Sequence, residues 1–241
     1  LSMVDTAKPL VTVTGISGFL GSWVGLLLLQ QGKYHVRGTV RSIANASKID
    51  PLRKAFGDLF DKLELVEAEL QDADAINRAV QGASYVIHVA SPIVFKNPED
   101  ENTVIRPALE GTLNVMRACH THKVKRVSLT SSAATITRIA HSKAPACFDE
   151  SHWSDINLPG IGAYVKSKIL AERAALDYLE SLPPSERFGL AVMNPSMISG
   201  PMLTKSTSTS VITLNLWLKN LYPAGVPKIT LSCVDVRDVA Q

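Results

Sequence analysis

The chain has 241 residues, of which 46% are hydrophobic and 20% are charged, so it is long and apolar enough for one large α/β domain with a substantial core. Its formal net charge of +3 is small and dispersed, which argues against a nucleic-acid partner. No segment reaches the ~18 consecutive apolar residues of a membrane span, and the N-terminus lacks the pattern of a signal peptide. We therefore expect no membrane partner.

The three cysteines are Cys119, Cys147 and Cys233, which lie far apart in the sequence. They form no C-x-x-C pair and have no histidines at metal-binding spacing. This usage predicts reduced thiols, no metal site and a cytoplasmic location.

The most informative stretch is Val11 to Gly21, which reads Val-Thr-Val-Thr-Gly-Ile-Ser-Gly-Phe-Leu-Gly. Alternating valine and threonine predict a short buried strand, and three glycines at intervals of three turn it into an apolar helix that runs to Gln31. In such a turn Gly15 permits the tight bend, Gly18 lets the backbone approach a pyrophosphate, and Gly21 lets helix and strand pack closely. The spacing is G-x-x-G-x-x-G rather than the commoner G-x-G-x-x-G. The assignment of a dinucleotide-binding turn therefore depends on agreement with motifs in the rest of the chain.

A second strand is expected over Tyr34 to Val40, and Arg41 follows it about twenty positions after Gly21. In a dinucleotide-binding fold this position meets the adenosine ribose, where a cation accommodates a 2′-phosphate. Arg41 therefore favours NADP over NAD, and Lys48 could supply a second cation.

Further strands are predicted over residues 63–68, 85–89, 125–130 and 190–193, alternating with helices over 72–80 and 103–120. Asp72 is a plausible N-cap of the first of these helices. Small residues follow the strand that contains His88, which lets a cofactor lie across the strand end. A single histidine in an apolar strand is more often a core residue than a catalyst. The alternation of strands and helices along the chain predicts a doubly wound, parallel Rossmann sheet.

Ser131 and Ser132 follow the fifth predicted strand and face the same crevice. A long loop over residues 141–162 leads to a helix that starts near Ala163. That helix carries Tyr164 and Lys168, four residues apart and therefore on one face.

The C-terminal part changes in composition after the sixth strand. Prolines and a glycine are expected to end regular structure over residues 194–201, a short amphipathic helix is expected over 214–221, and 234–240 has the pattern of a helix start. We predict an NADP-binding Rossmann domain over residues 1–195 and the start of a substrate-binding lobe over 196–241.

Together, these motifs resemble the extended short-chain dehydrogenase/reductase family, and within it the dihydroflavonol reductase and cinnamoyl-CoA reductase-like group. The matching segments span nearly the whole chain: 14–21, 40–41, 69–70, 88–92, 131–133, 149–153, 164–168 and 194–201. Members of this family continue well beyond the segment 235–240, so the resemblance implies a chain that is truncated within its substrate lobe.

The resemblance implies a carbonyl reductase or alcohol dehydrogenase with small-molecule substrates. Its catalytic residues would be Ser132, Tyr164 and Lys168. Its NADP(H) site would be lined by Gly15, Gly18, Phe19, Leu20, Gly21, Arg41, Lys48, Glu69, Leu70, Ala90, Pro195 and Ile198. Glu69 stands where the family usually has aspartate, and Thr137 stands where flavonoid reductases carry an asparagine or a similar residue.

Two other functions fit the same scaffold. Sugar-nucleotide epimerases and dehydratases share the serine, tyrosine and lysine. Ala133 and Ala134 replace the acidic pair of dehydratases, which argues against dehydration and leaves epimerisation open. The third interpretation is a non-catalytic NADP-sensing module, although such modules lose the tyrosine that this chain keeps.

Overall fold

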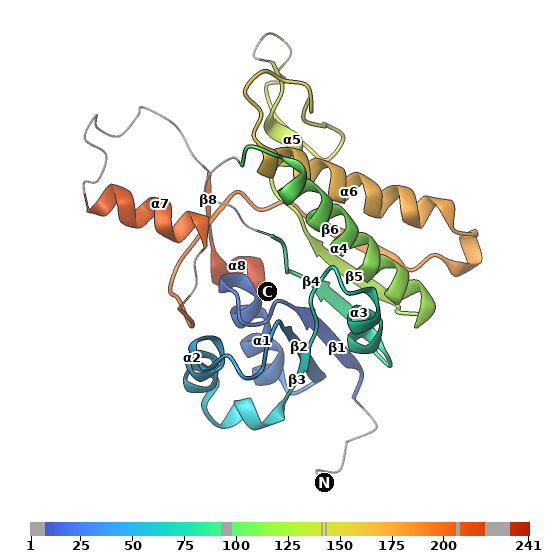
Figure 1. Ribbon diagram of the computed structural model, residues 1–241, viewed down its shortest axis with the longest axis vertical. Coiled ribbons are helices and arrows are strands. Elements are labelled where there is room, and N and C mark those ends of the chain that lie inside the picture. Colours follow the sequence, from blue (N-terminus) through green and yellow to red (C-terminus); the bar gives the residue numbers. More distant parts are fainter. Residues whose placement is uncertain (1–7, 93–97, 141, 143, 206–207, 220–231) are drawn as a thin grey trace.

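The computed structural model describes residues 8–92, 98–140, 142, 144–205, 208–219 and 232–241. Its centre is a six-stranded sheet in the order β3-β2-β1-β4-β5-β6, and every neighbouring pair in it is parallel (Figure 1). The strands are β1 (Leu10–Thr14), β2 (His35–Val40), β3 (Leu63–Glu67), β4 (Tyr85–His88), β5 (Arg126–Thr130) and β6 (Gly189–Met193). The predicted doubly wound Rossmann sheet is confirmed. Because the chain order reverses between β1 and β4, a crevice opens at their carboxyl ends, where ligands bind in such folds.

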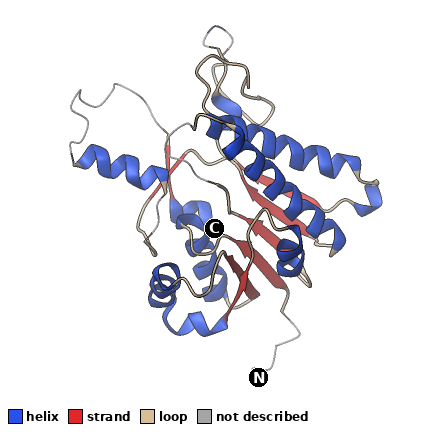
Figure 2. Cartoon of the chain, in the orientation of Figure 1, coloured by secondary structure: helices blue, strands red, loops and turns tan. Residues whose placement is uncertain are grey.

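Helices cover both faces of this sheet (Figure 2). One face carries α3 (Ala73–Val80), α4 (Asn102–Thr121) and α6 (Ala163–Ser181), whose apolar side chains share a core with β4 and β5. The other face carries α1 (Phe19–Gln31), α2 (Ala46–Phe56) and the 3₁₀ helix η1 (Gly57–Lys62), packed on β1 and β2. None of the helices among the described residues is long and apolar enough to cross a membrane.

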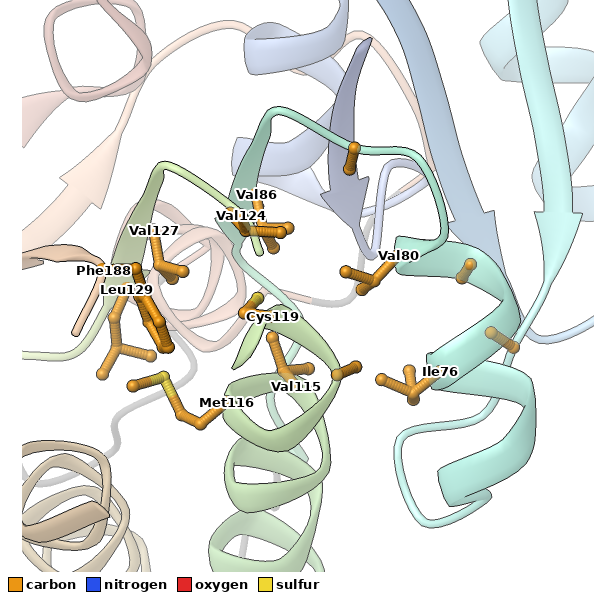
Figure 3. Close-up of a cluster of buried hydrophobic side chains, with 14 of the residues drawn as sticks. Ile76, Val80, Val86, Val115, Met116, Cys119, Val124, Val127, Leu129 and Phe188 are labelled. Carbon is orange, nitrogen blue, oxygen red and sulfur yellow. The ribbon is translucent and has the colours of Figure 1, made fainter. Parts of the chain in front are cut away.

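Figure 3 shows the core beneath α3 and α4, where valine, isoleucine and methionine side chains from both helices meet those of the strands. Ile76, Val115 and Val127 are completely buried there. Asp72 caps α3 as predicted, because its side chain accepts a hydrogen bond from the Ala75 N–H at 2.9 Å. These contacts fix α3 and α4 against the strands whose ends form the crevice.

The structure corrects three predictions near element ends. Regular structure does not end over 194–201, since β7 (Met197–Ser199) pairs in parallel with β8 (Cys233–Asp235). The segment 234–240 begins in that strand, and α8 (Val236–Ala240) starts only afterwards. The helix expected over 214–221 is α7 (Thr209–Leu218), which begins five residues earlier, and residues 220 and 221 lie outside the described part of the chain.

The helix α2 has no counterpart in the sequence prediction. It contains Pro51, which lacks the N–H that would bond the carbonyl of Ser47. Burial of Ile49, Leu52 and Phe56 against α1 and β2 stabilises it despite the missing bond.

Candidate active site

The turn between β1 and α1 has the geometry that the three glycines predict. Gly15 has a φ of +71°, and its carbonyl accepts the Gly18 N–H at 2.9 Å. A Cβ on Gly21 would lie 2.3 Å from the Gly15 oxygen, and a Cβ on Gly15 would lie 3.0 Å from the Cβ of Ala90. The turn therefore brings β1, the start of α1 and the end of β4 into direct contact.

This turn fits the pyrophosphate of a dinucleotide. In the described structure, Gly18 is the N-cap of α1 and provides no side-chain cap, and the first turn of the helix holds no acidic residue. Its first N–H groups are therefore left for an anion, which the helix dipole also favours. The side chains of Phe19 and Leu20 are buried in the core, so only their backbone could contact a cofactor.

The predicted adenosine side of the site lies at the ends of β2 and β3. Arg41 is exposed directly after β2, and the Ile43 N–H donates to the Glu67 carboxylate at 2.6 Å, which fixes the following loop. Glu69 is exposed after β3, whereas Leu70 packs towards α4 beside Gly111.

The chain segment 201–205, which we call the crossing segment, passes over the glycine turn. Trp23 Nε1 on α1 donates to the Pro201 carbonyl at 2.8 Å, and Thr204 Oγ1 donates to the Ser17 carbonyl at 3.2 Å. Lys48 Nζ on α2 reaches the Lys205 carbonyl at 3.3 Å. Lys48 thus contacts this segment, and Ile198 of β7, just before it, packs against the core of α1 and β1.

The three predicted catalytic residues come together at the carboxyl edge of β5. Tyr164 lies in the first turn of α6, and the Ser132 side chain acts on its hydroxyl by lowering the pKa of that group. Lys168 lies one helical turn further on, and its Nζ donates to the Thr130 carbonyl at 3.2 Å. The Pro195 carbonyl accepts the Ala133 N–H at 2.9 Å, which ties the Ser132 segment to the end of β6.

Burial changes the acidity of these groups. It raises the pKa of Tyr164, and the Ser132 side chain opposes this increase. Burial also lowers the pKa of Lys168 to about 8, against the opposing charge of Glu172. Lys168 is therefore charged below about pH 8 and loses its proton above it.

His88 is a neutral core residue beside Lys168. The Thr14 hydroxyl accepts the N–H groups of Val89 and Ala90, each at 3.1 Å, so its own proton is left for His88 Nδ1 at 2.8 Å. We assign the Nε2–H tautomer from this pattern. Burial and then the Lys168 charge lower the pKa of His88 to about 3, which keeps the ring neutral.

Two polar residues beside the predicted catalytic groups, the buried Glu172 and the half-buried Asn194, were not predicted. Glu172 lies on α6, and Asn194 follows β6. Asn194 Nδ2 donates to the Glu172 carboxylate at 3.0 Å. The spacing of four between Lys168 and Glu172 is the one sequence signal that could have identified the carboxylate. In the part of the chain that the structure describes, no cluster of three acidic, histidine or cysteine side chains could hold a metal ion.

Comparison with curated proteins shows relatives among plant reductases. The chain is 40% identical over 207 residues to a putative anthocyanidin reductase of Ginkgo biloba, covering 83% of this chain and 59% of that protein. It is 39% identical over 219 residues to a dihydroflavonol 4-reductase of Hordeum vulgare, covering 87% of this chain and 59% of that protein. The chain thus spans about three-fifths of the length of these relatives.

Among solved structures, yeast methylglyoxal/isovaleraldehyde reductase Gre2 complexed with NADPH matches with a TM-score of 0.82 at 28% identity. The match covers 96% of this chain and 72% of that chain. The resemblance to the reductases of the extended short-chain dehydrogenase/reductase family is thereby confirmed. The sequence profile described as "NAD dependent epimerase/dehydratase family" matches residues 11–223. Because that match spans most of the sequence, the chain belongs to the NAD-dependent epimerase/dehydratase family.

Proposed function

We propose that this protein is an NADP(H)-dependent oxidoreductase that reduces a carbonyl to an alcohol or catalyses the reverse reaction. The observation that carries the proposal is the buried Lys168, whose Nζ donates to the Thr130 carbonyl two residues before Ser132, with Tyr164 one helical turn earlier on α6. Support comes from the relatives, which are named as reductases, and from the yeast neighbour, which is complexed with NADPH.

Each of the three side chains has a distinct task in the reduction. When bound, NADPH supplies the hydride that adds to the carbonyl carbon. Tyr164 gives its phenolic proton to the carbonyl oxygen, and Ser132 donates a hydrogen bond that orients that oxygen. The ammonium of Lys168 favours the phenolate that Tyr164 becomes, because an opposite charge nearby stabilises the ionised form.

The remaining predicted residues serve the cofactor. The glycine turn and the backbone of Phe19 and Leu20 bind the pyrophosphate, and Arg41 with Lys48 binds the 2′-phosphate. Glu69, Leu70, Ala90, Pro195 and Ile198 line the remaining surface of the site. We retain the division into a cofactor domain over 1–195 and a substrate lobe from 196 as part of this proposal.

The decisive experiment follows the loss of NADPH absorbance with a panel of aldehydes and ketones, and the alcohol product is identified by mass spectrometry. We expect oxidation of NADPH that depends on both substrate and protein. A protein that binds NADPH tightly yet reduces no carbonyl, while interconverting a sugar nucleotide, would instead be an epimerase. Binding without any turnover would favour the sensing module.

Replacing Arg41 by alanine should weaken the preference for NADPH over NADH. A hydrogen bond to a charged group contributes ~1.5–3 kcal/mol, so the affinity ratio should fall by roughly ten-fold or more. The measurement is a fluorescence titration of both cofactors into each protein. Arg106→Ala is the control, because Arg106 is an exposed arginine on α4 that pairs with Glu110. An unchanged ratio in Arg41→Ala would remove Arg41 from the cofactor site.

A further inference from the structure

Glu172 is a buried carboxylate to which the proposed mechanism gives no task. It follows Lys168 by four residues on α6, so the two side chains share one helix face. Each of these residues is only 7% exposed. A buried charge is costly unless it is hydrogen-bonded and paired with an opposite charge, so its partners indicate its role.

The hydrogen bonds of Glu172 connect it to the chain around Ser132. The Ser131 hydroxyl and the Asn194 Nδ2 both donate to its Oε2 atom, the latter at 3.0 Å. The same Asn194 nitrogen lies 2.9 Å from Thr135 Oγ1 and 3.3 Å from the Ser132 carbonyl. The carboxylate therefore joins the end of β5, the end of β6 and α5 (Ala134–Thr137), which together place Ser132.

Among the described residues, few groups near Lys168 could balance its charge. From α6 it faces Glu172, from β4 it faces the neutral ring of His88, and from β5 it donates to the Thr130 carbonyl. The side chain that α4 contributes to the same small cavity is Thr112, which does not titrate. Glu172 is thus the anionic partner of Lys168 among these groups.

We propose that Glu172 is a positioning residue that balances the buried ammonium of Lys168 and, through Ser131 and Asn194, holds the segment that carries Ser132. The inference rests on the proposed function, because that function gives Lys168 and Ser132 their tasks. It is consistent with the electrostatic effect of Glu172, which raises the pKa of Lys168 against the lowering by burial.

The first test measures the charge of Lys168 directly in the whole protein. Lysines are labelled at Cε with carbon-13, and the Lys168 signal is identified by its absence in Lys168→Met. Glu172→Gln keeps the size and the acceptor oxygen of the side chain but removes its charge. We expect this change to lower the pKa of Lys168 by ~1 unit or more, because an opposite charge nearby shifts a pKa by about that much. An unchanged pKa in Glu172→Gln would overturn the proposal.

A matched control is Glu101→Gln. Glu101 pairs with Lys166, also on α6, at 2.6 Å, but that pair is partly exposed. The pKa of Lys168 should stay the same in this variant, and an equal shift would show that any carboxylate near α6 has the effect, which would overturn the specific role. Because the titration needs no turnover, it can support or overturn this inference even if the panel of carbonyls shows no reduction.

The second test is a double-mutant cycle on the urea unfolding midpoint, with Glu172→Gln, Lys168→Met and both changes together. If the two charges balance each other, the double variant should unfold at a higher urea concentration than Glu172→Gln alone, because no unpaired ammonium stays buried. If Glu172→Gln by itself fails to fold, the double variant should still fold, for the same reason. A double variant that is no more stable than Glu172→Gln would overturn the proposal.

Discussion

Tyr164→Phe is expected to lose ~10²–10⁴-fold in turnover while it binds NADPH as the unchanged protein does, since general acid catalysis contributes about that factor. The substitution removes only the hydroxyl that would give its proton to the carbonyl oxygen. The ring keeps its place in the first turn of α6, and the glycine turn that would hold the cofactor lies on a different element. Initial rates on a confirmed substrate and a fluorescence titration of NADPH measure the two effects separately.

Tyr178→Phe is the matched control for this substitution. Tyr178 lies on the same helix, but its hydroxyl lies 3.3 Å from His120 Nδ1, at the far end of α4 from the crevice. We expect its turnover to stay close to that of the unchanged protein. A Tyr164→Phe variant with a rate like that of Tyr178→Phe would show that another group supplies the proton.

Gly21→Ala should both destabilise the protein and weaken NADPH binding. The added Cβ would lie 2.3 Å from the Gly15 oxygen and 3.1 Å from the Ile16 Cα, and neither backbone atom can move without shifting β1 or α1. Overpacking of this kind costs ~1–3 kcal/mol of unfolding free energy. Since the displaced atoms form the phosphate turn, we expect the NADPH affinity to fall by roughly ten-fold or more.

Urea unfolding and cofactor titration of Gly21→Ala are compared with the same two measurements on Gly189→Ala, which is the control. At Gly189 the nearest atom to an added Cβ is the Arg126 Nε at 3.1 Å, which belongs to a flexible side chain. The control should therefore change stability little and leave NADPH affinity unaffected. Equal affinity in Gly21→Ala and Gly189→Ala would contradict a cofactor-binding role of the turn.

The sheet could be predicted from the sequence because its signals are local. Alternating valine and threonine before Gly15, and the repeated strand and helix patterns, fix both the element types and their parallel arrangement. The three-residue strands β7 and β8 could not be found in this way, because each is shorter than a readable alternation and exists through pairing between Met197 and Cys233, far apart in the chain. Helix α2 was not predicted; it forms although Pro51 lacks a backbone N–H, because Leu52 and Phe56 are buried in the fold.

In the candidate site, too, local spacing could be predicted from the sequence and contacts between distant segments could not. Tyr164 and Lys168 could be predicted because four-residue spacing on a helix places two side chains together whatever surrounds them. Glu172 has the same spacing from Lys168, but a helical glutamate is ordinarily solvated, and its burial depends on Ser131 and Asn194, which follow β5 and β6. The tautomer of His88 likewise depends on the hydroxyl of Thr14, 74 positions earlier.

The crossing segment also bears on the order in which the chain folds. Thr204 and Ser17 are 187 positions apart, and Trp23 and Pro201 are 178 apart, so these contacts close very long loops. Contacts between such distant residues form slowly. During synthesis the glycine turn leaves the ribosome well before the crossing segment that closes over it. The contact between Ser17 and Thr204 can therefore form only after the 187 positions between them have been made, and until then Trp23 on α1 lacks its Pro201 partner.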